Sequence, residues 1–210
     1  MYLSASARVG YYSDFLIEVG KREKPEKIIG RRNAVGSSKQ KQQQMWAKIY
    51  VDSPIGYWEI QGSELGISRI QRVDKPLSGS GEEMPEIMRE AAAQLRAYFE
   101  GSLRQFNLKL DFGAAPAFYR AVWEVLLRVP YGHTTSYLAI AEALNNPAAV
   151  RAVGQANAHN PIAIVVPCHR CIARSGDLQG YFYGLDVKRA LLELENPRSF
   201  ARQGSLFLEE

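Results

Sequence analysis

The spacing of apolar residues changes along the chain, and this change constrains the fold more than any other feature. Residues 47–73, AKIYVDSPIGYWEIQGSELGISRIQRV, alternate roughly between apolar and polar side chains, which predicts strands with a turn at residues 53–56. Residues 84–101, MPEIMREAAAQLRAYFEG, place apolar residues at the spacing of one helix face and end in glycine. Strands followed by a helix predict a small α+β domain over residues 45–112.

Residues 113–198 have a different pattern, which predicts a second and mainly helical domain. Helical spacing covers four stretches, residues 117–129, 134–144, 148–158 and 187–195. Asn145-Asn146-Pro147 separates two of these short helices, which makes them a helix-turn-helix candidate. IAIVV, residues 162–166, is expected to be a short buried strand. The predicted fold class is therefore α+β, with a sheet-plus-helix domain followed by a mainly helical C-terminal domain.

The two ends of the chain look least like packed structure. Residues 1–44 contain the charged stretch KREKPEKIIGRRN and the polar run SSKQKQQQ, so we expect a flexible extension. Residues 199–210 are expected to form a tail. Residues 1–45 hold nine Lys/Arg and four Asp/Glu, a net charge of +5, whereas the whole chain carries +4. The rest of the chain is thus near neutral, so a nucleic-acid surface on the folded body should be a small patch.

Composition excludes several classes of protein. No apolar run in the 210 residues approaches the roughly 20 residues that cross a bilayer, and the first residues do not resemble a signal peptide. Two cysteines do not form a disulfide scaffold. We therefore expect a protein of a reducing, bacterial-type cytoplasm with no membrane contact.

Both cysteines lie in VVPCHRCI, residues 165–172, as a C-x-x-C pair. A redox pair is disfavoured because the preceding elements are helical and not a βαβ unit. Zinc is disfavoured because no second ligand pair has useful spacing, and haem attachment because Ile172 stands where a histidine is needed. Two alternatives remain from the local sequence alone. Cys168 is either a reactive thiol that His169 helps to deprotonate or a buried, inert side chain.

The longer sequence around this stretch resembles the O6-alkylguanine-DNA alkyltransferase family. RAVGQANAHNPIAIVVPCHR carries the resemblance, with GYFYGL and KRALLELE downstream and DSPIG, QLRAYFEG and VWEVLLRVPYGHTTSY upstream. It spans about residues 46–195. It implies a monomer without metal or cofactor that moves an alkyl group from O6-alkylguanine in double-stranded DNA irreversibly onto one of its own cysteines.

The resemblance also implies the catalytic residues. Cys168 stands at the position of the alkyl acceptor, and His169 at that of the base that takes the thiol proton through a water. Glu195 matches the carboxylate that orients this histidine, with Glu193 as a nearby rival. Asn160 matches the hinge asparagine between the helix-turn-helix and the active-site segment.

For DNA binding, the resemblance implies that the target nucleotide is flipped out of the duplex. Arg151 matches the arginine that fills the vacated stack, and Ala152 beside it is small enough for close approach to the backbone. Tyr137 matches the tyrosine that crowds the rotated phosphate and contacts the flipped guanine. The implied guanine pocket comprises Tyr137, Cys171, Tyr181 and Phe182, with the Phe182 amide near O6.

Two departures from the family pattern carry expectations of their own. Cys171 replaces a more usual aliphatic residue, so a disulfide with Cys168 under oxidation would disable repair. Phe182 and Tyr183 are bulky where some relatives have small residues, which predicts a preference for methyl over large alkyl groups. The main alternative function is a protein that binds alkylated lesions without transferring anything, although such relatives lack the acceptor cysteine.

Overall fold

The computed structural model describes residues 47–76, 84–173 and 175–197. All of them belong to one compact unit, Gln42–Glu210. The expectations for the flexible extension of residues 1–44 and for the tail of residues 199–210 fall outside this described part.

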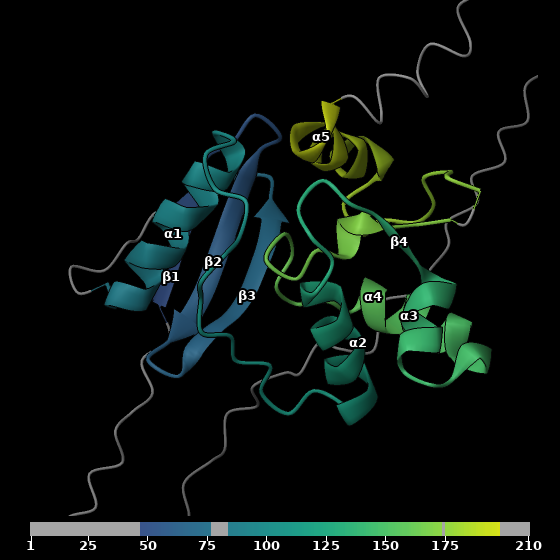
Figure 1. The fold of residues 1–210 in the computed structure, drawn as a ribbon. Coiled ribbons are helices and arrows are strands. Elements are labelled where there is room, and N and C mark those ends of the chain that lie inside the picture. The colour runs from purple at the N-terminus through teal and green to yellow at the C-terminus, as the bar shows by residue number, and fades with distance from the viewer. Residues whose placement is uncertain (1–46, 77–83, 174, 198–210) are drawn as a thin grey trace, which may run out of the picture. The chain divides into compact units, whose positions relative to one another are not determined.

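The first part of the unit is a three-stranded antiparallel sheet with a helix against it (Figure 1). The strands β1 (Ala47–Val51), β2 (Tyr57–Ser63) and β3 (Gly66–Val73) pair in sequence order. The helix α1 (Glu86–Phe99) packs on the sheet, with its core residues Met88, Ala91, Ala92, Leu95 and Tyr98. The i+4 spacing predicts a face of Ile87, Ala91, Leu95 and Phe99, of which Ala91 and Leu95 are fully buried and the other two half-buried. This arrangement confirms the predicted sheet-plus-helix beginning of the fold.

The second part is mainly helical, as predicted. Its elements are α2 (Ala117–Leu127), α3 (Tyr137–Ala143), the 3₁₀ turn η1 (Pro147–Ala149), α4 (Val150–Ala158) and α5 (Leu185–Glu195). The hydroxyl of Ser136 caps α3 by accepting a hydrogen bond from the Ala139 amide at 3.1 Å. A left-handed residue, Asn145 with φ of 55°, turns the chain between α3 and α4, and the two helices pack together.

The prediction of a strand over residues 162–166 is wrong. The segment is buried, but Ile164 has φ of 72°, and only single bridges join Ile162 to Ile70 and Ala163 to Val166. The run of apolar residues indicates that the segment is buried. It does not distinguish a strand from a tight turn, because both have apolar side chains when they lie inside the protein. The chain then enters a second 3₁₀ turn, η2 (Cys168–Arg170), so Cys168 and His169 are not neighbours on an extended strand.

This turn lies between the two parts of the fold. The Ile70 amide of β3 donates to the Pro161 carbonyl at 2.9 Å, and the Ile70 carbonyl accepts from the Ala163 amide at 3.0 Å. On the other side, a two-residue parallel pairing joins β4 (Thr135–Ser136) to β5 (Cys171–Ile172). The cysteine turn is thus fixed to the sheet on one side and to the start of α3 on the other.

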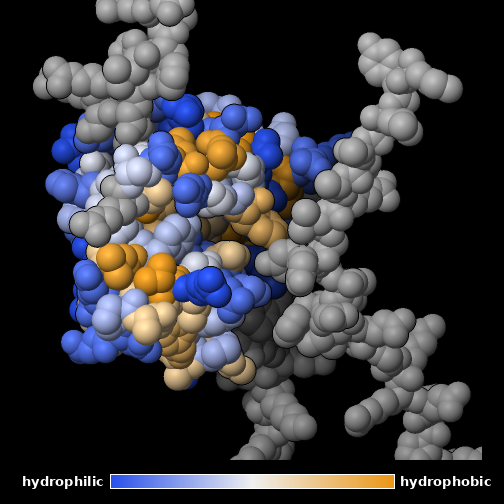
Figure 2. Space-filling model, turned by 90° about the vertical axis from the view of Figure 1, so that its right-hand side faces the viewer, coloured by the Kyte–Doolittle hydropathy of each residue, from blue (hydrophilic) through white to orange (hydrophobic). Residues whose placement is uncertain are grey.

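Hydrophilic residues alternate with smaller hydrophobic areas over the face that lies on the right of Figure 1, as Figure 2 shows. Within the described residues, no helix is both long and apolar enough to span a bilayer.

Candidate active site

Cys168 lies at the start of η2 and is only 5% exposed. Its sulfur accepts a hydrogen bond from Asn160 Nδ2 at 3.0 Å. The same amide nitrogen donates to the Val166 carbonyl at 2.8 Å, while Asn160 Oδ1 accepts from the Ile162 amide at 3.0 Å. Asn160 therefore holds both ends of the turn that precedes the cysteine, which agrees with its position between α4 and the thiol.

Burial raises the pKa of the Cys168 thiol, because the thiolate loses hydration. The hydrogen bond from Asn160 and the charge of Lys188 act in the opposite direction but do not outweigh burial. The side chain is therefore a thiol at neutral pH, and it needs a proton acceptor before it can attack as a thiolate.

Glu195, the last residue of α5, lies at the centre of a dense hydrogen-bond cluster. Arg170 donates from Nε to Oε2 at 2.8 Å and from Nη2 to Oε1 at 2.9 Å, a paired contact of the kind that fixes a carboxylate in one plane. Oε1 also accepts from the Tyr98 hydroxyl at 2.8 Å, and Oε2 from the Gly132 amide at 3.2 Å. Tyr98 belongs to α1, so the first part of the fold helps to hold this carboxylate.

Glu195 is ionised in this cluster. Burial by itself would raise its pKa, but the hydrogen bonds from His169 and Arg170, together with the charge of Arg170, prevail and hold the pKa well below its ordinary value. Gly132 allows the close approach at this point: its φ is 75°, and a Cβ there would come within 3.1 Å of the Glu195 carbonyl oxygen.

His169 is fully buried, and its Nε2 lies 2.8 Å from Glu195 Oε1. Burial lowers the pKa of His169, although the hydrogen bond and charge of Glu195 oppose this shift. We therefore assign a neutral imidazole at pH 7 whose Nε2–H donates to the carboxylate. Nδ1 is then an acceptor, and within the described residues it has no hydrogen-bond partner. A neutral ring held in this way can receive a proton.

Aromatic side chains surround the thiol. Burial raises the pKa of Tyr137 to about 12, and its hydroxyl is hydrogen-bonded to Cys171. Cys171 is fully buried, and burial raises its own pKa to about 12. Tyr181 interacts directly with Cys168. Tyr137, Cys171 and Tyr181, three of the residues expected to form the guanine pocket, therefore all lie near Cys168.

Phe182 and Tyr183 do not share one environment. The Phe182 side chain is 64% exposed, whereas Tyr183 packs edge-on against Trp58 of β2 with ring centroids 5.4 Å apart. Burial and then the proximity of Cys168 raise the pKa of Tyr183 to about 12. Of these two bulky residues, Tyr183 is the one whose environment includes Cys168.

Arg151 and Ala152 lie in the first turn of α4, away from the cluster of Glu195. Arg151 is exposed and Ala152 half-buried. The opposite face of α4 is buried, and its Asn157 Nδ2 lies 3.4 Å from the Cys168 carbonyl oxygen. The helix that presents Arg151 outward therefore also contacts the cysteine turn.

Three residues of the site were not predicted from the sequence: Arg170, Tyr98 and Lys188. Lys188 is fully buried, and its ammonium donates to the carbonyls of Cys171 and Gln179, both at 2.7 Å. Burial lowers its pKa. A signal was available, since the lysine of KRALLELE and the arginine of PCHR are both part of the quoted motifs. Tyr98 also lies in a quoted stretch, QLRAYFEG, but nothing in the sequence indicated its contact with Glu195, which joins residues 97 positions apart.

The described residues contain no group of three His, Cys, Asp or Glu side chains arranged to hold a metal ion. The chemistry that this arrangement supports is that of a buried nucleophilic thiol with a neutral histidine nearby and a fixed carboxylate behind it.

Comparison with known proteins gives consistent matches over the described part. Two family models match, the DNA-binding domain of 6-O-methylguanine DNA methyltransferase over residues 117–197 and its ribonuclease-like domain over residues 47–112. The methylated-DNA–protein-cysteine methyltransferase of Mycolicibacterium paratuberculosis is 47% identical over 152 residues, which cover 71% of this chain and 92% of that protein. The protein of the same name from Methanosarcina barkeri is 44% identical over 154 residues, covering 69% of this chain and 94% of the relative.

Solved structures agree. The crystal structure of the Mycobacterium tuberculosis O6-methylguanine methyltransferase matches with a TM-score of 0.65 and 43% identity, covering 73% of this chain and 94% of that one. A structure of the Mycobacterium tuberculosis protein in complex with DNA matches with a TM-score of 0.63 and 44% identity, covering 73% and 93%.

Proposed function

Since this chain belongs to the 6-O-methylguanine DNA methyltransferase family, we propose that it repairs O6-alkylguanine in double-stranded DNA by taking the alkyl group onto Cys168. The observation that carries the proposal is the position of the Cys168 thiol. It is buried, held by Asn160 at 3.0 Å, and followed directly by the His169–Glu195 pair at 2.8 Å.

The reaction is a displacement at carbon. His169, through a water at Nδ1, takes the proton of the Cys168 thiol, and Glu195 stabilises the resulting imidazolium. The sulfur attacks the alkyl carbon, the carbon–O6 bond breaks, and its electron pair leaves with the guanine. The imidazolium of His169 returns its proton through water and the guanine gains one proton at N1, so the net change is one thiol converted to a thioether and one normal guanine restored. A thioether does not release its alkyl group, so each molecule acts once.

The electrostatics of the site support this order of steps. A raised pKa keeps Cys168 protonated and unreactive until a substrate is bound, and a lowered pKa keeps His169 ready to accept a proton. Lys188 lies close enough to lower the pKa of the cysteine, so its charge favours the thiolate once it forms.

DNA binding by the same molecule requires the base to leave the stack, because a buried thiol cannot reach O6 inside a duplex. We assign Arg151, exposed in the first turn of α4, to the vacated stack, and Ala152 to close approach of the backbone. Tyr137, Cys171 and Tyr181 are assigned to the guanine pocket. We also propose that the protein acts as a monomer, without a cofactor, in the cytoplasm. The proposed boundary between its two domains lies at residues 112–113.

The test is the stoichiometry of transfer. The intact mass of the protein is measured after mixing with a duplex that contains a single O6-methylguanine. We expect a gain of one methyl group that saturates at one per molecule, with normal guanine left in the DNA. A protein that binds the lesion duplex and gains no mass would instead be a lesion-binding protein without transfer, the alternative that the buried Cys168, His169 and Glu195 disfavour.

A further inference from the structure

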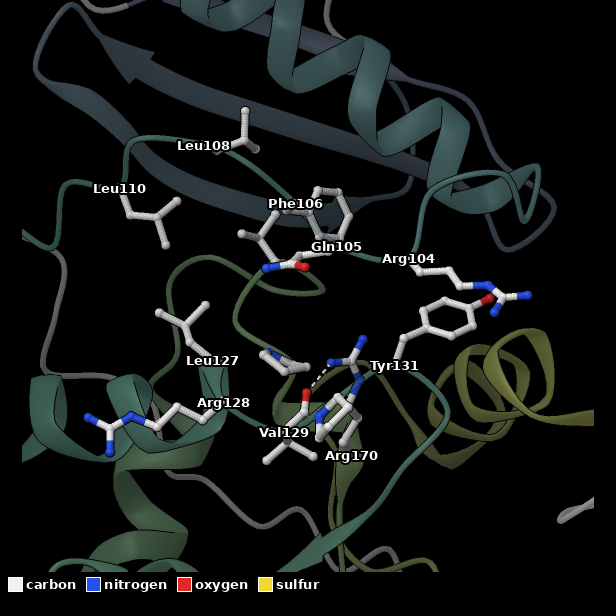
Figure 3. A pocket seen from close by; sticks show the side chains of 13 residues that line it. Arg104, Gln105, Phe106, Leu108, Leu110, Leu127, Arg128, Val129, Tyr131 and Arg170 are labelled. Atoms are coloured by element: carbon white, nitrogen blue, oxygen red, sulfur yellow. Dashed lines mark hydrogen bonds between the residues drawn. The ribbon is translucent and has the colours of Figure 1, made fainter.

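A pocket of about 700 Å³ lies behind the cysteine turn and is separate from the space beside the thiol. Its walls are the segment of residues 104–110, the end of α2 with the residues after it, and parts of the segment 165–170 (Figure 3). Pro167 and Arg170 line it, but Cys168, Tyr137 and Tyr181 do not. Nothing in the repair reaction uses this pocket.

The walls of the pocket are held in place by other parts of the fold. The Asn107 amide donates to Gln94 Oε1 at 2.8 Å, and Gln94 Nε2 donates to the Asn107 carbonyl at 3.0 Å. Beside it, the Ile67 amide of β3 donates to the Lys109 carbonyl at 2.8 Å. The pocket is therefore preformed, which reduces the ordering cost of binding.

The chemistry of the lining is apolar in the middle and cationic at the ends. Phe106, Leu108, Leu110, Leu127 and Val165 contribute the apolar surface, and Leu127 remains 42% exposed. Arg104 and Arg128 lie at opposite ends of the pocket in Figure 3. Arg170 is already engaged with Glu195 and with the Val129 carbonyl at 2.6 Å. No Asp or Glu is among the described residues that line the pocket.

A fitting occupant has consecutive apolar residues followed by negative charge. The chain carries such a sequence in LFLEE, residues 206–210, which lies outside the described part. We propose that this segment of the same molecule binds in the pocket, with Leu206, Phe207 and Leu208 on the apolar surface and the two glutamates at Arg128.

The path of the chain allows this contact. The chain leaves α5 beside Tyr131, one of the lining residues, whose hydroxyl donates to the Leu194 carbonyl at 3.1 Å. Nine residue-to-residue steps separate Pro197 from Leu206, and they can span up to about 30 Å when the chain is extended. Figure 3 shows α5 on the side of Tyr131 and Arg104, with Arg128 at the far end. A segment that enters beside Tyr131 and runs across the pocket places Glu209 and Glu210 near Arg128.

Photo-crosslinking of the full chain tests the contact. A benzophenone amino acid replaces Phe207, and the crosslinked peptides are identified by mass spectrometry after irradiation of dilute protein. We expect crosslinks within one molecule to residues 106–110 or 127–131. Crosslinks to another surface, crosslinks only between two copies of the chain, or no crosslink at all would overturn the proposal.

Charge reversal in the same crosslinking protein provides a second measurement. Arg128→Glu should lower the yield of pocket crosslinks about fivefold, the effect of about 1 kcal/mol. Combining it with Glu209→Arg and Glu210→Arg should restore the yield. The matched control is Arg120→Glu, an exposed arginine of α2 outside the pocket, which should leave the yield unchanged. Equal yields in the Arg128 and Arg120 variants would contradict the assignment. The outcome does not depend on whether the protein transfers alkyl groups.

Discussion

Glu195 Oε1 accepts a hydrogen bond from His169 Nε2 at 2.8 Å, and both side chains are buried although they lie 26 positions apart. The bond fixes the tautomer of the histidine, because a ring that donates from Nε2 keeps Nδ1 as its acceptor. The carboxylate is in turn fixed by Arg170 and Tyr98. The proton acceptor of the proposed reaction is therefore oriented by residues from both parts of the fold.

The first prediction concerns the carboxylate. Glu195→Gln should slow methyl transfer strongly and lower the free energy of unfolding by about 3–5 kcal/mol, because it leaves the buried Arg170 without its ionic partner. Urea unfolding and single-turnover transfer rates measure the two effects. Glu193→Gln, two positions earlier in the same helix and exposed, is the control and should leave both close to wild type. Similar behaviour of the two variants would refute the assignment of Glu195.

The second prediction is a dependence of stability on pH. The pKa of folded His169 is lowered by burial, so the unfolded chain binds a proton more readily. The stability that comes from neutral His169 is complete above its unfolded pKa of about 6.5 and is lost as the pH falls from there toward the folded pKa. Glu195, whose pKa is also lowered, adds a further loss as the pH falls below its ordinary value of 4.5.

Urea unfolding between about pH 7.5 and pH 5.5 measures the histidine effect. The free energy of unfolding should fall with pH in the wild type, and the fall should be smaller in His169→Gln. The control is His133→Gln, since His133 is exposed. An unchanged slope in His169→Gln would show that the buried imidazole is not the titrating group.

The third prediction separates DNA handling from chemistry. Arg151→Ala should reduce methyl transfer from duplex DNA at least about tenfold, equivalent to about 1.4 kcal/mol, because nothing then fills the vacated stack. Transfer from the free base O6-methylguanine needs no base flipping and should stay at the wild-type rate. Arg189→Ala removes an exposed arginine from α5 and serves as the control. If Arg151→Ala slowed methyl transfer from the duplex and from the free base equally, Arg151 would act in the transfer step and not in base flipping.

The fourth prediction concerns the size of the adduct. Tyr183 packs on Trp58 and lies near Cys168, so it should restrict the alkyl group. The wild type should repair O6-methylguanine faster than O6-benzylguanine in the same duplex, and Tyr183→Ala should narrow this difference. Phe182→Ala, which removes the neighbouring exposed ring, should leave the difference between the two repair rates unchanged. Comparable wild-type rates for both adducts would show that the pocket is not tight.

The fifth prediction concerns Cys171. Hydrogen peroxide should inactivate the protein by oxidising both thiols to one disulfide, while the peroxide is reduced and, with the two thiol hydrogens, becomes two molecules of water. Because burial raises the pKa of both cysteines, the reaction should be slow. Dithiothreitol should restore activity in the wild type but not in Cys171→Val, where Cys168 oxidises beyond recovery. Full recovery of the variant would rule out a protective disulfide.

Much of the fold could be predicted because its helices and strands carry strong local patterns. The alternation over residues 47–73 and the helical spacing in the second half correspond to the elements found. The strand predicted over residues 162–166 failed because a run of apolar residues indicates burial and not backbone conformation. Ile164, in a left-handed conformation inside the core, has no local sequence signal.

The site was less accessible to sequence reasoning. Motif resemblance predicts roles for Cys168, His169, Asn160 and Glu195, and the structure pairs Asn160 with Cys168 and His169 with Glu195. Tyr98 could not be found, since its contact with Glu195 depends on how α1 packs against the second part of the fold. Phe182 and Tyr183 looked equivalent in the sequence, but Phe182 is exposed whereas Tyr183 is half-buried against Trp58.

The central claim is that Cys168 is the acceptor, and the position of the transferred group tests it most directly. Protein reacted with one equivalent of a duplex containing O6-methylguanine is digested, and the peptide spanning residues 161–174 is fragmented by tandem mass spectrometry. We expect a methyl group on Cys168 and none on Cys171. A methyl group on Cys171, or an unmodified peptide beside repaired DNA, would contradict it.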